Sequence, residues 1–185
     1  KPYYNVNNFV NLINDPRNTY NEMYTVDNLT NMINTDGPMY YNIPMNKMIN
    51  FAKNAIMLDE PVWFTCDMSK YSSRFYCVNG PSFFKEYEKD TLSKKERLIM
   101  LDSGVTHAMV LHGFSKDNWK IENSWGTFGA HKGYYIADNI WMKEYVYQMI
   151  IPQKLAKNIP KHVNKPKQLP CFDPFGMLPV KTLKK

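Results

Sequence analysis

Short apolar runs that alternate with polar residues recur at close spacing through the second half of the chain, and they constrain the fold most. Alternation with a period of two places every second side chain on one face of a strand. Loops as short as residues 115–118 and 126–132 separate neighbouring runs, and such short connections join antiparallel strands. The pattern predicts an antiparallel sheet with strands near residues 61–66, 106–114, 119–123, 133–137 and 145–151.

Helical spacing of apolar residues is confined to a few segments. Residues 6–13 predict a helix that Asp15-Pro16 would end, because Pro disfavours a helical conformation in the residue before it. A second helix is expected after Pro44, which suits a first helical turn, and residues 93–96 have the spacing of a capping box. Few helices precede many strands, so the predicted fold class is α+β. The expected buried stripe of the second helix is Met48, Ile49, Ala52, Ala55 and Ile56.

Charge divides the chain into two parts. Residues 152–185 hold eight Lys, one Asp and several prolines, whereas residues 1–151 are almost neutral. The 44% hydrophobic content suits one folded domain, or part of a larger one. We therefore expect a strand-rich body over residues 1–151 and an extended basic tail over residues 152–185. The tail is interpreted either as a solvated end or as a surface for nucleic acid or another acidic partner.

Signals for cofactors, metals and membranes are sparse. No apolar run approaches the roughly 18 residues of a membrane helix. Cys66, Cys77 and Cys171 show neither metal-ligand spacing nor disulfide density. We expect no metal, no cofactor and no membrane partner, and a reducing, cytoplasmic compartment.

His107 and Asn123 carry the strongest chemical signal. A cysteine peptidase needs a thiolate, a His that activates it and a third group that orients the His. An Asn carbonyl can accept the imidazole N–H without adding charge, which permits a thiolate–imidazolium pair. His107 lies sixteen residues before Asn123, which leaves room for a strand, a turn and a second strand. Asn123 opens the sequence Asn-Ser-Trp-Gly, in which Trp125 would shield the His–Asn hydrogen bond from water.

These residues also have a purely structural interpretation, in which His107 is a buried, hydrogen-bonded His and Trp125 belongs to the core. Each motif alone fits either interpretation, but both together in this order favour the catalytic one. The other candidates have weaker signals and are interpreted as structural or solvated: His112, His131, His162 and the Asp59-Glu60 pair.

Further segments extend the pattern along almost the whole chain. They are Asn14-Asp15-Pro16-Arg17-Asn18, Tyr24-Thr25-Val26, Pro61-Val62-Trp63-Phe64 with Cys66-Asp67, Lys95-Glu96-Arg97-Leu98, Thr106-His107-Ala108-Met109, His131-Lys132-Gly133-Tyr134, Trp141 with Glu144-Tyr145-Val146-Tyr147, and Asp173-Pro174-Phe175-Gly176-Met177. In this order, they resemble segments of the bleomycin hydrolase (aminopeptidase C) family of papain-like cysteine peptidases.

The resemblance implies a papain-like fold, of which this chain is mainly the strand-rich half that carries His and Asn. It implies that His107 acts as general base and later as general acid, and that Asn123 orients it. It also implies a cytosolic aminopeptidase that cleaves peptide substrates and assembles as a hexamer around a central cavity. In this family the C-terminal tail reaches into the cleft, where its carboxylate is thought to hold the substrate amine.

The nucleophilic Cys departs from the family pattern. Papain-like enzymes place it roughly 130–150 residues before the His, whereas 106 residues precede His107. Cys66 and Cys77 lack the Gly-x-Cys-Trp setting at a helix start that lowers a thiol pKa. We therefore expect the nucleophile and the oxyanion-hole Gln on an upstream segment or a partner chain, and the isolated chain to be inactive.

The tail also departs from the family pattern, because residues 178–185 continue past the segment that resembles the family's end. The extension would displace the terminal carboxylate and bring Lys184 and Lys185 near a substrate amine, so peptidase action broader than strict aminopeptidase action stays open. We expect the tail to run back over the body toward His107. The two alternatives to a peptidase are a non-catalytic peptidase-like scaffold and a nucleic-acid-binding module that uses the basic tail.

Overall fold

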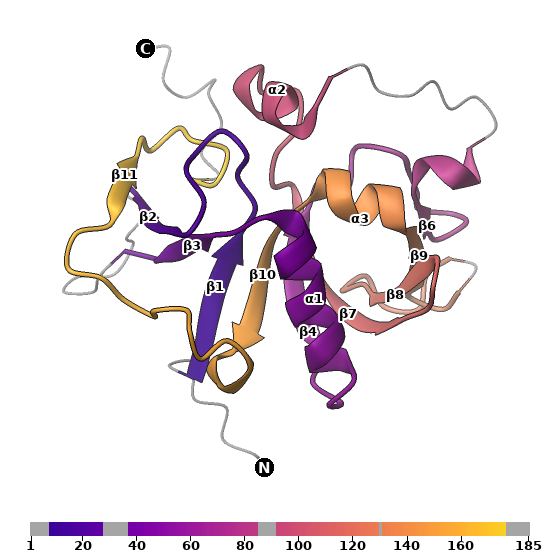
Figure 1. The fold of residues 1–185 in the computed structure, drawn as a ribbon. Helices are drawn as coiled ribbons and strands as arrows, with labels where there is room; N and C mark the ends of the chain where they lie inside the picture. The colour runs from indigo at the N-terminus through magenta and orange to yellow at the C-terminus, as the bar shows by residue number, and fades with distance from the viewer. Residues whose placement is uncertain (1–7, 28–36, 85–91, 130, 177–185) are drawn as a thin grey trace.

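The computed structural model describes residues 8–27, 37–84, 92–129 and 131–176 (Figure 1). Within these ranges, eleven strands form one sheet that three α-helices accompany. The strands are β1 (Phe9–Ile13), β2 (Glu22–Val26), β3 (Tyr40–Asn42), β4 (Val62–Cys66), β5 (Ser72–Ser73), β6 (Val78–Asn79), β7 (His107–Phe114), β8 (Asn118–Glu122), β9 (Tyr134–Asp138), β10 (Val146–Pro152) and β11 (Lys167–Leu169). The helices are α1 (Met45–Ile56), α2 (Lys94–Ile99) and α3 (Asn139–Tyr145), with short 3₁₀ turns at Pro81–Phe83 and Gln153–Leu155.

The strands follow the order β11-β2-β3-β1-β10-β4-β7-β8-β9-β6-β5 across the sheet. From β1 through β10, β4, β7 and β8 to β9, every neighbouring pair is antiparallel. The strands that alternation and short loops predicted are β4, β7, β8, β9 and β10, so that prediction is confirmed. The sheet as a whole is nevertheless mixed, because β3 pairs with β1, β11 with β2 and β6 with β9 in parallel.

The helix predicted over residues 6–13 is wrong, because the described part of this segment is the strand β1. β1 pairs with β10 on one side and with β3 on the other. Val10 and Leu12 enter the larger core cluster, whereas Ile13 enters a second one on the opposite face. A strand buried on both faces loses its alternation, and its apolar residues then fit a helical spacing equally well.

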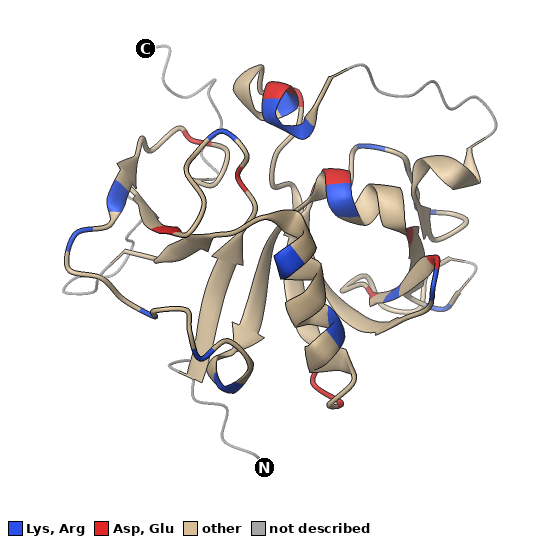
Figure 2. Cartoon of the chain, viewed as in Figure 1, with Lys and Arg blue, Asp and Glu red and all other residues tan. Residues whose placement is uncertain are grey.

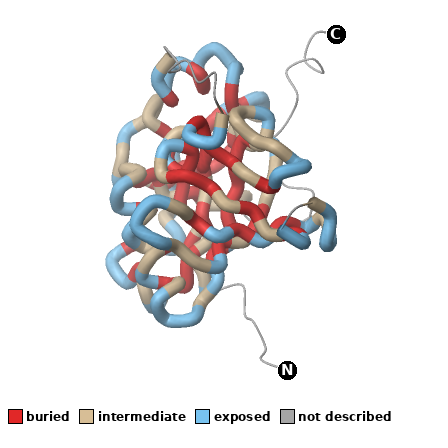
Figure 3. Tube along the Cα trace, turned by 90° about the vertical axis from the view of Figure 1, so that its right-hand side faces the viewer, coloured by how far each residue is buried: buried red, intermediate tan, exposed pale blue. Residues whose placement is uncertain are grey.

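The predicted second helix is confirmed as α1, which lies against one face of the central strands β4, β7 and β10 (Figure 1). Of its predicted buried stripe, Met48, Ala52 and Ala55 are buried, whereas Ile49 and Ile56 are only partly buried against the core. The capping box at Ser93 is also confirmed, since its side chain accepts the Glu96 N–H while the Glu96 carboxylate accepts the Ser93 N–H. Figure 3 shows the buried part of the trace running through the middle of the molecule, between exposed loops.

After β10, the chain returns along the sheet edge to β11, which pairs with β2. Basic residues occur at intervals along this returning segment (Figure 2). Residues 177–185 lie outside the described residues, so the placement of Lys184 and Lys185 stays a prediction. In the described ranges, no helix is long and apolar enough to cross a membrane, and no group of three or more His, Cys, Asp or Glu is placed to hold a metal ion.

Lys94 at the start of α2 gives the fold a testable dependence on pH. Its ammonium is buried and donates to the carbonyl oxygens of Lys143 (3.1 Å) and Val146 (2.5 Å), at the end of α3 and the start of β10. Burial and the charge of Arg97 lower the pKa of Lys94 to about 7, although Glu144 and Asp15 act to raise it. Between pH 7 and 9 the unfolded chain therefore binds more protons than the folded one, and stability rises with pH.

We expect the free energy of unfolding to rise by up to about 1.4 kcal/mol per pH unit in this window. Lys94→Met should flatten that slope, as measured by urea denaturation at pH 7, 8 and 9. Lys95→Met, at the exposed neighbouring position on α2, should keep it and serves as the control. Equal slopes in the parent protein and Lys94→Met would contradict the assignment.

Candidate active site

The register of β7 and β8 brings His107 and Asn123 to the same end of the sheet. β7 begins at His107, and β8 ends at Glu122, directly before Asn123. Val110 lies opposite Glu122, so the same antiparallel register places Asn123 opposite Met109, two residues from His107. Residues two apart on a strand share a face, and diagonal neighbours across a pair lie within side-chain reach. The hairpin alone therefore brings the two side chains together.

The two side chains meet at hydrogen-bond distance, with His107 Nε2 2.8 Å from Asn123 Oδ1. The same oxygen accepts the backbone N–H of Ser124 at 2.8 Å. A backbone N–H can only donate, so this atom of the amide must be the oxygen, and His107 Nε2 must carry the hydrogen. The neutral imidazole then keeps its lone pair on Nδ1. Among the described residues, Nδ1 has no hydrogen-bond partner, so it is the nitrogen available for proton transfer.

Trp125 covers this pair. The centroid of its ring lies 4.7 Å from that of the His107 ring, at an interplanar angle of 39°. Asn123 is only 6% exposed, whereas His107 is half-buried. The backbone N–H of Asn123 donates to the carbonyl oxygen of Gly133 at 3.0 Å, which anchors the residue to the segment before β9. A hydrogen bond protected from water in this way is stronger than an exposed one.

A buried carboxylate holds the segment that leads into β7. Asp67 is 1% exposed, and its Oδ2 accepts the Ser103 hydroxyl at 2.6 Å. Its Oδ1 accepts the Ser69 N–H at 2.8 Å, and Thr106 Oγ1 accepts the Met68 N–H at 2.9 Å. The Thr106 N–H donates to the carbonyl oxygen of Cys66. The residues just before His107 are thus tied to the end of β4, which limits the positions that the imidazole can take.

Neither cysteine near the site has the setting of a nucleophile. Cys66 lies opposite His107 in the β4–β7 pair, but it is fully buried and its Sγ is 3.7 Å from the His107 carbonyl oxygen. Burial, with the charge of Asp67, raises the pKa of the Cys66 thiol well above its ordinary value. Cys77 is also fully buried, with Sγ against the carbonyl oxygens of Arg74 (3.4 Å) and Phe128 (3.8 Å). A thiol attacks as the thiolate, which the raised pKa of Cys66 disfavours. Burial of Cys77 keeps its sulfur away from a substrate.

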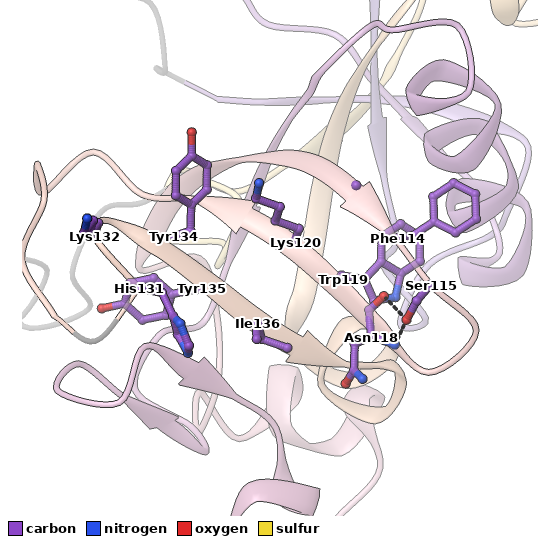
Figure 4. A pocket seen from close by; sticks show the side chains of 11 residues that line it. Phe114, Ser115, Asn118, Trp119, Lys120, His131, Lys132, Tyr134, Tyr135 and Ile136 are labelled. Atoms are coloured by element: carbon purple, nitrogen blue, oxygen red, sulfur yellow. Dashed lines mark hydrogen bonds between the residues drawn. The ribbon is translucent and has the colours of Figure 1, made fainter.

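The remaining candidates lie apart from His107. His112 is exposed and contacts Glu122. Glu60 pairs with Lys154, Asp59 forms a turn with a positive φ, and His162 is exposed in the tail. His131, in the loop before β9, borders a shallow hollow of about 700 Å³ that extends over β8 and β9 to Phe114 at the far end of β7 (Figure 4). Neither His107 nor Asn123 lines that hollow.

The described end of the tail lies beside the segment that precedes β7. Phe175 packs against Tyr147, whose hydroxyl is 2.6 Å from Ser103 Oγ. Burial raises the pKa of Tyr147 to about 12, so the hydroxyl stays protonated. A Cβ at Gly104 would lie 3.6 Å from Pro174, and Asp173 accepts a hydrogen bond from Arg17 at 2.9 Å. Residues 173–175 therefore lie beside the segment around Ser103 and Gly104, which precedes His107 by three to four positions. The described tail thus runs back over the body toward His107, as the sequence predicted.

Two features of this region were not predicted from the sequence. Asp67 and Ser103 were not expected to support His107, because they are 36 residues apart and only the β4–β7 pairing joins them. Arg74 was not singled out, yet its guanidinium carbon lies 4.0 Å from the centroid of the Trp125 ring. No local pattern signals such a stacking contact, since it depends on how two distant loops meet.

Comparison with known proteins shows similarity along nearly the whole chain. The sequence profile of the family described as "Peptidase C1-like family" matches residues 2–176. A bleomycin hydrolase from Gallus gallus is 36% identical over 198 residues, covering 96% of this chain and 43% of the relative. An aminopeptidase C from Lactococcus lactis subsp. lactis is 34% identical, covering 96% and 45%.

A solved structure shows the same fold. PepW from Lactobacillus rhamnosis superposes with a TM-score of 0.83 at 30% sequence identity, over 95% of this chain and 43% of that one. The chain thus spans less than half the length of the relatives that it matches. A profile match over nearly the whole chain, together with relatives of this identity, shows that the chain belongs to the peptidase C1-like family, with the bleomycin hydrolases and aminopeptidases C.

Proposed function

We propose that this chain is the His- and Asn-bearing part of a cysteine-type aminopeptidase whose nucleophilic Cys lies on another segment. The observation that carries the proposal is the His107–Asn123 hydrogen bond at 2.8 Å under Trp125, which leaves Nδ1 without a hydrogen-bond partner among the described residues. The site residues of the proposal are His107 as base and acid, and Asn123 as the group that orients it. Peptides are the proposed substrates.

In this proposal the thiol of the missing Cys gives its proton to His107 Nδ1, and the thiolate attacks the peptide carbonyl carbon. Asn123 keeps the imidazolium in place by accepting its Nε2–H. The imidazolium then returns the proton from Nδ1 to the leaving amine, which departs as the acyl-enzyme forms. A water molecule gives a proton to Nδ1 and attacks the acyl carbon, which releases the acid and restores the thiol.

The resemblance extends the proposal to the assembly and the compartment. By this resemblance, the complete protein is a homo-oligomer, specifically a hexamer. A cytoplasmic location would supply the reducing environment that keeps a catalytic thiol reduced. The division into a body over residues 1–151 and a tail over residues 152–185 belongs to the same proposal. Sedimentation of the complete protein would measure its oligomeric state directly.

We expect the isolated chain to show no peptidase activity, because without a thiolate beside His107 no acyl-enzyme forms. The measurement is the release of the fluorophore from an amino-acid amide, by the chain alone and by the chain joined to the upstream Cys-bearing segment. Hydrolysis only by the joined protein, blocked by iodoacetamide, would support the proposal. Iodoacetamide-sensitive hydrolysis by the chain alone would contradict it and would point back to Cys66 or Cys77.

A further inference from the structure

Arg74 lies against the Trp125 ring that covers the His107–Asn123 pair. It is an exposed residue directly after β5, and its guanidinium carbon is 4.0 Å from the centroid of the Trp125 ring. The Trp125 ring is in turn 4.7 Å from the His107 ring. The distance from the Arg74 guanidinium carbon to the centroid of the His107 ring therefore cannot exceed the sum of these two distances. An extended peptide advances roughly 3.3–3.6 Å per residue, so a group one to three residues from the scissile bond can reach Arg74.

The backbone around Arg74 is held in place. β5 and β6 pair as a hairpin, and Ser73 Oγ accepts the N–H of Tyr76 at 3.3 Å inside the turn. Cys77 at the end of the turn has its Sγ against the carbonyl oxygens of Arg74 and Phe128, which joins the turn to the loop after Trp125. A Cβ at Gly129 would lie 2.2 Å from that sulfur, so this loop can approach only because residue 129 is glycine. The charge of Arg74 thus occupies a defined place beside Trp125.

The guanidinium of Arg74 has free hydrogen-bonding capacity. Within the described ranges, Arg17 and Arg97 form ion pairs with carboxylates, whereas Arg74 forms none. Stacking on an indole uses the flat face of a guanidinium and leaves its N–H groups, which lie in the plane, directed outward. Those donors match the two oxygens of a carboxylate. A cation that is ordered, unpaired and next to the reacting residues is placed to bind an anionic part of a substrate.

We infer that Arg74 determines specificity by binding a carboxylate of the peptide substrate beside the His107–Asn123 pair. The inference rests on the proposed peptidase function and adds a substrate class to it: peptides with a negative charge close to the scissile bond. That carboxylate belongs either to the free C-terminus of a short peptide or to an Asp or Glu side chain. The chemistry of recognition is the same for both sources.

Three matched substrates separate these sources in the complete, Cys-containing protein. They are alanyl-alanine amide, which has no carboxylate, alanyl-alanine with a free C-terminus, and alanyl-glutamate α-amide with a side-chain carboxylate. Arg74→Gln should lower kcat/KM about tenfold for the substrate whose carboxylate Arg74 binds, the loss expected for a hydrogen bond to a charged group. The neutral amide should change less than twofold, and Arg74→Lys should recover part of the loss. Lys120→Gln is the control, since Lys120 is also an exposed cation over an aromatic ring, 4.4 Å from Tyr134.

The outcomes distinguish this inference from the function on which it rests. A selective loss with one or both carboxylate substrates supports it and identifies the source of the charge. Equal losses with all three substrates would mean that Arg74 only supports the position of Trp125, and would overturn the inference. No loss with any substrate, or the same loss in Lys120→Gln, would also overturn it while leaving the peptidase function intact. A complete protein that hydrolyses none of the three would overturn both.

Discussion

Replacing His107 with Ala should lower kcat/KM for peptide hydrolysis by the complete protein at least about 10⁴-fold. The reason is that Nδ1 is the open nitrogen of an imidazole whose other nitrogen is held by Asn123 at 2.8 Å. In the proposed mechanism, loss of this group leaves the thiol without a base and the leaving amine without a proton donor. Initial rates with a fluorogenic amino-acid amide would measure the loss.

His112→Ala is the matched control, because His112 is on the same strand but is exposed and contacts Glu122. It should keep activity within about twofold, as is usual for surface substitutions outside a site. Circular dichroism of both variants would show that the fold is kept. Comparable activity in His107→Ala and the parent protein would refute the assignment of the base, whereas equal losses in both variants would indicate a general disturbance of β7.

Replacing Trp141 with Ala should lower the free energy of unfolding by about 3–5 kcal/mol, the usual cost of removing a large buried aromatic side chain. Trp141 is fully buried in α3, and its indole N–H donates to the carbonyl oxygen of Lys70 at 3.0 Å. Its backbone N–H donates to Asp138 Oδ1 at 2.7 Å, which caps α3. The substitution removes the ring from the larger core cluster and leaves the Lys70 carbonyl without this donor.

Trp63→Ala provides the matched control for this prediction, since Trp63 on β4 is 39% exposed. We expect it to cost less than about 1 kcal/mol. Urea denaturation followed by far-ultraviolet circular dichroism avoids the change in tryptophan fluorescence that both variants cause. A loss below about 1 kcal/mol in Trp141→Ala would show that the site collapses around the missing ring or that α3 contributes little to the fold.

Where local physical rules operate, the sequence predicted the structure well. Alternation identified β4, β7, β8, β9 and β10 because each contributes an apolar face to a core and a more polar face to solvent or to a smaller cluster. Ser93 and Glu96 predicted the start of α2 because a capping box is satisfied within four consecutive residues. His107 and Asn123 could be proposed together because a tight antiparallel hairpin leaves few ways to place their side chains.

The tertiary structure alone decided the rest. The segment before Asp15 is a strand because β10 and β3 pair with it on its two sides. Nothing in the local sequence of this segment indicates that these distant strands will pair with it. α3 and β11 are short, so their stability depends more on packing against distant residues than on the intrinsic propensities of their own residues. Residues far apart along the chain, such as Asp67 with Ser103 and Arg74 with Trp125, meet only after the sheet has formed. Sequence by itself therefore determined which residues could carry the chemistry, whereas the long-range pairing of strands decided which groups surround and orient them.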